Sequence, residues 1–288
     1  MVYLKSFNLL SEDMELNIIG EDPRRIYNSY YPLNIFTEKH LKKIDFDNIT
    51  IFYGGNGSGK TTLLNIISNK LEALRKSKIN KGNIFDLYVC HCTFDFDHED
   101  PAEIKFISSD DVVDSLLDIR AINAHVNRKK AELAKEWVEN KYENKVVDCN
   151  NYEALKDKVE ARKNTMSKFI RERLSNNNII EQSNGESALM FWEKEISENA
   201  IYILDEPENS LSAENQLKLK QFIEDSARFY NCQFIMATHS PFFLNLTGAR
   251  IYDLDSYPVD VKKWNELDNV KTYYKFFKDN EADFEDLK

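Results

Sequence analysis

Apolar residues stand at alternate positions in several short stretches of the chain, which is the period of a β-strand. The clearest stretch holds Ile49, Ile51 and Tyr53. Strands are predicted at residues 2–10, 14–19, 49–53, 84–94, 103–107, 200–204, 232–237 and 250–254. We expect the first two of these to pair as a hairpin.

In other stretches the apolar residues recur every three or four positions, which predicts helices. Helices are expected at residues 62–76, 111–142, 151–174 and 213–229, and another is expected to begin near Ser183. Strands that alternate with helices along a chain favour a parallel sheet covered on both faces. The sequence therefore predicts an α/β protein with a mainly parallel central sheet and an antiparallel N-terminal part.

Two long helical stretches interrupt this alternation. Both are rich in Lys, Glu and Ala, and polar residues separate them at 148–151. At 1.5 Å per residue the first would be at most ~48 Å long. We expect an inserted arm of two antiparallel helices at residues 111–175, between an N-terminal part at 1–110 and a C-terminal part at 176–288.

Composition narrows the class of protein. The chain has 288 residues, 42% of them hydrophobic, and no apolar run approaches the ~20 residues of a membrane span. A cytoplasmic protein is expected. The net charge of −11 argues against a surface that is basic throughout. DNA contact would have to be local, on the basic residues Arg128, Lys129, Lys130, Arg162, Lys163, Lys168, Arg171 and Arg173. From the residues alone, a solvated helix face is the favoured explanation of this run of basic residues.

Four cysteines in a chain of this length do not form a disulfide framework. Cys90, His91, Cys92 and His98 have the composition of a zinc site, but they fall in a predicted strand. A strand would send His91 to the face opposite the two thiols. We therefore favour core packing over a metal site here.

The strand at 49–53 runs directly into a glycine-rich turn, GGNGSGKTT, that precedes a predicted helix. Without Cβ atoms, such a loop can turn its N–H groups toward one anion at the helix N-terminus. Lys60 can reach the β and γ phosphates of a nucleotide, and the Thr61 hydroxyl can bind Mg²⁺. The predicted phosphate-binding residues are Gly54, Gly55, Asn56, Gly57, Ser58, Gly59, Lys60, Thr61 and Thr62.

Two further strands end in polar residues. The strand at 200–204 is followed by Asp205 and Glu206, which at the carboxyl edge of the sheet could hold Mg²⁺ and act as general base toward a water. The strand at 232–237 is followed by His239, whose neutral imidazole could donate to a γ phosphate. The candidate catalytic residues are Lys60, Glu206 and His239, and the candidate Mg²⁺ ligands are Thr61 and Asp205.

GGNGSGKTT, SNGES, ILDEPENSLS and ATHSP, in this order, resemble the motifs of ABC-type P-loop ATPases of the AAA family, and within them the stand-alone SMC/RecF-like and OLD-like group. The resemblance implies ATP and Mg²⁺ as ligands. It also implies a homodimer that forms on ATP binding, in which Ser183, Asn184, Gly185 and Glu186 of one copy face the γ phosphate held by the other. A serine and a glycine at a helix start suit an anion.

The chain departs from that pattern in two places. Class members carry a glutamine between the phosphate loop and the signature segment, which SNGES matches here, and no Gln occurs between Thr61 and Glu181. Ser108, Ser109 or Asp110 could replace it. Ser210, Leu211 and Ser212 stand where transporter-type ATPases have a loop with an aspartate.

The resemblance implies an ATP-hydrolysing dimerisation switch, with slow turnover, that acts in DNA repair or antiphage defence. DNA would be bound through the helical arm, and a nuclease would be the partner effector. The alternative is a regulatory ATPase that controls a toxin-type protein effector without DNA contact, which the acidic composition favours. A transporter subunit is disfavoured by the missing glutamine and by the size of the helical insertion.

Overall fold

The computed structural model of the chain describes residues 1–21, 30–79, 81, 84–97, 100–142, 159–174 and 184–283, with the backbone alone for Glu21 and for 184–186. It divides into two compact units. The first unit consists of Met1–Val113 and Asn184–Lys288, and the second unit of Asp114–Ser183.

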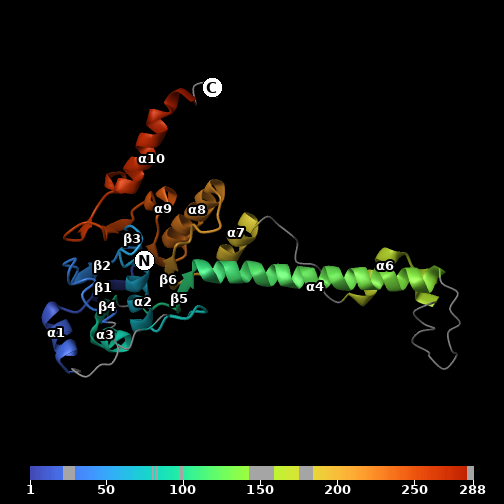
Figure 1. Cartoon of the computed structure of the whole chain (residues 1–288), viewed down its shortest axis with the longest axis horizontal. Helices are drawn as coiled ribbons and strands as arrows, with labels where there is room; N and C mark the ends of the chain where they lie inside the picture. Colours follow the sequence, from blue (N-terminus) through green and yellow to red (C-terminus); the bar gives the residue numbers. More distant parts are fainter. Residues whose placement is uncertain are drawn as a thin grey trace. The chain divides into compact units, whose positions relative to one another are not determined.

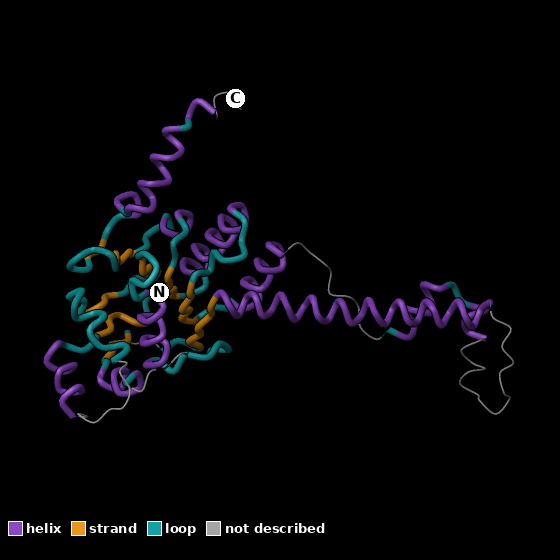
Figure 2. Tube along the Cα trace, viewed as in Figure 1, coloured by secondary structure: helices purple, strands orange, loops and turns teal. Residues whose placement is uncertain are grey.

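The first unit contains a six-stranded sheet with the strand order β5-β6-β7-β3-β8-β9. Strands are drawn in orange in Figure 2, and Figure 1 labels β3, β5 and β6 of this sheet. Its strands are β3 (Ile49–Tyr53), β5 (Glu103–Ser108), β6 (Ala200–Asp205), β7 (Gln233–Ala237), β8 (Arg250–Asp253) and β9 (Asp260–Val261). The first five run parallel, and β9 pairs antiparallel with β8. Every residue of β3, β6 and β7 is buried, as expected of central parallel strands covered on both faces. The predicted fold class is confirmed.

A three-stranded antiparallel sheet in the order β2-β1-β4 packs beside it. Its strands are β1 (Leu4–Asn8), β2 (Lys43–Asp45) and β4 (Thr93–Phe96). The buried side chain of Gln233 joins the two sheets: its Oε1 accepts from the N–H groups of Tyr3 and Leu4, at 3.0 and 2.8 Å, and its Nε2 donates to Leu4 O at 2.9 Å. One side-chain amide therefore satisfies backbone groups at the start of β1.

The helices of the first unit lie between and after these strands. They are α1 (Glu12–Glu21), α2 (Lys60–Lys70), α3 (Phe85–His91), α7 (Asn184–Glu195), α8 (Ala213–Phe229), α9 (Pro241–Leu244), the 3-10 helix η1 (Trp264–Glu266) and α10 (Asp268–Asp279). The helix α8 has the predicted bounds. The sequence analysis did not predict α10.

The predicted strand at 14–19 is wrong, because these residues belong to α1. A short apolar run does not distinguish a strand from a helix, and the acidic residues of the first turn favour a helix N-terminus. The buried Glu15 carboxylate accepts from Asn34 N at 3.0 Å and from Thr37 Oγ1 at 2.8 Å. The partners of β1 are instead β2 and β4.

The predicted strand at 84–94 is also wrong over most of its length, since residues 85–91 form α3 and only Thr93 and Phe94 lie in β4. Cys92 is buried and Cys90 is exposed, and His98 lies outside the described residues. No cluster of three or more potential metal ligands occurs in the described part of the chain. The helix predicted at 62–76 ends early, at Lys70, and Leu74 pairs with Lys105 in a short parallel bridge.

The second unit is built on α4 (Ser109–Tyr142), which begins in the first unit and continues as one helix (Figure 2). Residues 159–163 are helical, and α6 (Met166–Arg173) follows, so the predicted helix at 151–174 is interrupted in its described part. Thr165 caps α6 by accepting from Lys168 N. A small core holds Leu133, Trp137, Ala161 and Phe169. No helix among the described residues has the length and apolar character needed to cross a bilayer.

Candidate active site

The glycine-rich loop joins β3 to α2 in the predicted place. Gly57 and Gly59 have φ values of 80° and 99°, which a residue with a Cβ adopts only with strain. A Cβ on Gly54 would lie 2.6 Å from Ser58 Oγ. Lys60 is buried and donates to the carbonyls of Gly54 and Gly55, at 2.8 and 3.0 Å. Burial lowers the pKa of Lys60, while Glu206 and Asp205 act to raise it.

Residues outside the motif hold the two ends of this loop. Lys39 Nζ donates to Ser58 O at 2.7 Å and to Leu254 O at 2.6 Å, and it thereby ties the loop to the segment after β8. Gly55 N donates to the Asp255 carboxylate at 2.5 Å. These contacts join residues up to 215 positions apart, so no local pattern in the sequence indicated them.

Asp205 and Thr61 meet at the carboxyl edge of the six-stranded sheet. Thr61 Oγ1 donates to Asp205 Oδ1 at 3.3 Å, although β6 and β3 are separated by β7. Burial raises the pKa of Asp205 to about 6, and the Thr61 hydrogen bond opposes the shift. A buried carboxylate beside a hydroxyl is an oxygen ligand set that suits a hard divalent cation such as Mg²⁺, whose charge would favour the ionised form of Asp205.

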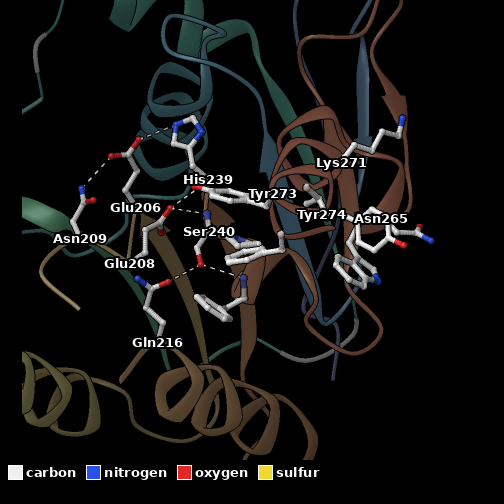
Figure 3. Close-up of a pocket in the computed structure, with 15 residues that line it drawn as sticks. Glu206, Glu208, Asn209, Gln216, His239, Ser240, Asn265, Lys271, Tyr273 and Tyr274 are labelled. Carbon is white, nitrogen blue, oxygen red and sulfur yellow. Dashed lines mark hydrogen bonds and ion pairs between the residues drawn. The ribbon is translucent and has the colours of Figure 1, made fainter. Parts of the chain in front are cut away.

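Glu206 follows Asp205 with φ at 50°, a left-handed backbone conformation that is costly for a residue with a side chain. Its Oε1 lies 3.4 Å from His239 Nε2, and its Oε2 accepts from Asn209 Nδ2 at 3.1 Å (Figure 3). Burial, followed by the charge of Lys60, lowers the pKa of His239. The imidazole is therefore neutral near pH 7 and can donate one hydrogen bond.

Glu208 positions the turn that carries His239, a role the sequence analysis did not assign. Its Oε1 accepts from Thr238 Oγ1 at 2.8 Å, from His239 N at 2.6 Å and from Ser240 N at 3.1 Å. Burial raises the pKa of Glu208, and these hydrogen bonds oppose the shift. Ser240 Oγ in turn donates to Gln216 Oε1 at 2.6 Å (Figure 3). Glu208 is the third acidic residue of the motif DEPEN, so it is visible in the sequence. Its role is not, because its hydrogen-bond partners lie about thirty residues further along the chain.

Of the three candidates for the missing glutamine, Ser108 lies beside the site. Ser108 and Asp205 are register partners on the parallel strands β5 and β6, so their side chains share one face of the sheet. Ser108 Oγ donates to the buried Asp111 carboxylate at 2.8 Å. Ser109 and Asp110 begin α4, and Asp110 is exposed.

The signature segment is described only in part. Ser183 lies outside the described residues, and the side chains of Asn184, Gly185 and Glu186 are not described. The helix α7 begins at Asn184, close to the predicted start near Ser183. Contact between these residues and a nucleotide held by a second copy stays a prediction.

The sheet, the glycine-rich loop and the acids at the strand ends define a P-loop ATPase. The chain belongs to the AAA domain family, because a family model with that description matches residues 29–287. This family confirms the predicted AAA-family ATPase. No curated protein matches the chain.

Several solved structures are similar to the chain at low sequence identity. An Smc head domain with an extended coiled coil bound to the C-terminal domain of ScpA, from Pyrococcus furiosus, has a TM-score of 0.41 at 15% identity, covering 98% of this chain and 100% of that one. The SMC head domain of Thermotoga maritima has a TM-score of 0.39 at 13% identity, covering 91% and 98%. A metal-chelate type ABC transporter in an inward-facing conformation has a TM-score of 0.39 at 16% identity, covering 81% and 82%.

Proposed function

We propose that the chain binds ATP with Mg²⁺ and hydrolyses it at the carboxyl edge of the six-stranded sheet. The observation that supports this best is the pair of contacts at that edge, Thr61 with Asp205 at 3.3 Å and Glu206 with His239 at 3.4 Å. In this proposal the loop from Gly54 to Thr62 binds the phosphates through its N–H groups. Lys60 exchanges its two carbonyl partners for phosphate oxygens, which are stronger acceptors because they are charged.

Each of the other residues has one task in the proposed reaction. Thr61 and Asp205 hold Mg²⁺, and Ser108 lies beside Asp205 where it can orient a ligand water. When bound, Mg²⁺ neutralises charge on the phosphate oxygens. Glu206 orients the attacking water and accepts its proton. His239 donates to the γ phosphate from its neutral imidazole, and Glu208 holds its backbone N–H at 2.6 Å.

We further propose that a second copy of the chain completes the site. Ser183, Asn184, Gly185 and Glu186 of the partner subunit would face the γ phosphate, so that ATP stabilises a closed homodimer and hydrolysis opens it. ATP can shift this equilibrium only through contacts that it makes in the closed state. The γ phosphate supplies those contacts in this proposal.

Light scattering coupled to size-exclusion chromatography tests the dimer. Glu206→Gln is expected to be monomeric without nucleotide and dimeric with saturating Mg·ATP, because binding remains and hydrolysis stops. The control is Glu214→Gln, which makes the same change on an exposed acid in the first turn of α8. A Glu206→Gln protein that stays monomeric with ATP bound would contradict the dimer and leave the ATPase proposal standing.

The partner of this switch is proposed to be DNA, which the second unit would bind. A nuclease is the proposed partner effector, and the proposed process is DNA repair or antiphage defence. Arg128, Lys129, Arg162 and Lys163 are exposed there, which supports contact with phosphates. The net charge of −11 instead favours the second candidate, regulation of a toxin-type protein effector without DNA. Fluorescence anisotropy of a labelled duplex, with and without ATP, separates the two. DNA binding should weaken steeply as salt rises, and it should weaken in a variant that replaces these four basic residues.

A further inference from the structure

The first turn of α10 contacts the candidate catalytic edge through one residue, Asn269. Its side-chain Nδ2 donates to the carbonyl oxygen of His239 at 3.0 Å. Its backbone N–H donates to the Tyr53 hydroxyl at 3.0 Å. Tyr53 is the last residue of β3, directly before the glycine-rich loop. Asn269 thus joins α10 both to the turn that carries His239 and to the strand that carries the loop.

These bonds complete the restraint on the His239 backbone. Glu208 accepts from the His239 N–H at 2.6 Å, and Asn269 donates to the His239 carbonyl at 3.0 Å. Both peptide groups that flank the His239 Cα are therefore held by side chains from other elements. The imidazole approaches Glu206 to 3.4 Å, and a change of a fraction of an ångström in the Cα position would alter that approach.

Few of the described residues of α10 are buried against the rest of the first unit. Val270 is buried, and so is Leu267, directly before the helix. Tyr273, Tyr274, Phe276 and Phe277 are 44 to 68% exposed. A cavity of about 960 Å³ runs from Glu206 and His239 to the aromatic side chains Trp264, Tyr273, Tyr274 and Phe277 (Figure 3). The cavity leaves the His239 side chain partly exposed, while the flanking residues Thr238 and Ser240 are buried, so the Asn269 hydrogen bond acts together with this packing to hold the turn.

We propose that Asn269 is a positioning residue for hydrolysis: it holds His239 at the distance from Glu206 that the reaction needs, and it makes the catalytic geometry depend on where α10 begins. This inference rests on the proposed role of His239. It adds a residue 30 positions from His239 that lies in none of the sequence motifs.

A double-mutant cycle tests the proposal. Asn269→Ala is expected to lower kcat about tenfold, the size of effect that losing one positioning hydrogen bond produces. The ATP dissociation constant, measured with a fluorescent ATP analogue, should change less than twofold, because Lys60, Thr61 and Asp205 are untouched. In a His239→Ala background the same Asn269→Ala change should lower kcat less than twofold, since the residue that it positions is gone.

Two further variants make the result decisive. Asn269→Asp has nearly the shape of the native side chain, keeps the backbone bond to Tyr53 and removes the Nδ2 donor, so it should also lower kcat and serves if Asn269→Ala does not fold. Asn231→Asp removes the same kind of donor, from Asn231 Nδ2 to Asn199 Oδ1 in the loop before β7, and should leave kcat within twofold. Equal losses from Asn269→Ala with and without His239, or a loss in ATP affinity alone, would overturn the proposal.

The outcomes also separate this inference from the function on which it rests. If His239→Ala lowers kcat and Asn269→Ala does not, only the role of Asn269 is wrong. If the unmodified protein does not hydrolyse ATP, or if His239→Ala hydrolyses it at the unmodified rate, the proposed function fails first.

Discussion

Each of the two compact units is stabilised internally, and the contacts inside them differ in sequence range. In the first unit, buried polar side chains join residues far apart in the chain, as Gln233 joins Leu4 across 229 positions. In the second unit, a small core surrounds Trp137 and Phe169, and Trp137 Nε1 donates to Asn164 O, only 27 positions away. The long-range network can fix catalytic groups to fractions of an ångström, whereas the short-range core stabilises a few helices. We therefore expect substitutions in one unit to leave the properties of the other largely unchanged.

The largest expected effect tests the catalytic edge of the first unit. Glu206→Gln should lower kcat for ATP hydrolysis about a thousandfold, within the range for loss of a general base. Steady-state phosphate release measures the rate, and a filter-binding assay checks that ATP is still bound. Glu214→Gln should retain full activity. A Glu206→Gln enzyme with more than a tenth of normal activity would show that another group accepts the proton.

The second unit is tested through its core. Trp137→Ala should destabilise that unit by about 3 kcal/mol, through the loss of buried ring area and of the hydrogen bond to Asn164 O. Circular dichroism during thermal unfolding should show an early transition, while ATP hydrolysis at 25 °C stays within twofold. Val138→Ala, on the next and more exposed position of the same helix, should cost less than 1 kcal/mol. Complete loss of hydrolysis in Trp137→Ala would show that the units are strongly coupled.

Alkylation of the buried Cys92 measures local unfolding of the first unit, because the thiol must become exposed before it can react. Burial raises the pKa of Cys92 to about 12, so at pH 8 only about one thiol in ten thousand is ionised. As pH rises toward 12 the reactive thiolate fraction increases. At pH 8, Cys92 should be alkylated by iodoacetamide at least about a hundredfold more slowly than the exposed Cys90, as followed by peptide mass spectrometry. Trp137→Ala should leave this ratio unchanged, and a rise in Cys92 labelling in that variant would contradict independent units.

The smallest expected effect concerns Asp255, whose carboxylate accepts from Gly55 N at 2.5 Å. A negative charge beside a phosphate-binding loop opposes a bound triphosphate. Asp255→Asn should therefore tighten ATP binding about threefold at low salt, with a smaller gain at high salt because the exposed carboxylate is screened. Isothermal titration calorimetry measures the ATP dissociation constant at low and at high salt. Asp260→Asn on β9 is the matched control, because it makes the same chemical change. Weaker binding in Asp255→Asn would show that the hydrogen bond to the loop matters more than the charge.

The sequence was sufficient wherever the determinant was local. The strand at 49–53, the helix at 213–229 and the glycine-rich loop all follow from residues within a few positions of one another. The errors at 14–19 and 84–94 arose because a short apolar run fits either period, and burial against distant residues decides between them. Glu208 and Asn269 could not be assigned a role from sequence, since each acts on the His239 backbone about thirty positions away. The roles of Lys60, Asp205, Glu206 and His239 stay predictions.

The amide of Gln233 also bears on the order in which the chain becomes structured. Strand β1 lies within the first ten residues, yet the backbone groups at its start are hydrogen-bonded by a side chain 229 positions later. Ribosomes therefore synthesise most of the polypeptide before these hydrogen bonds can form. The second unit is a continuous segment with nearby partners, and such segments acquire structure sooner during translation. The inserted helices are thus expected to form before the last strands of the six-stranded sheet have been synthesised.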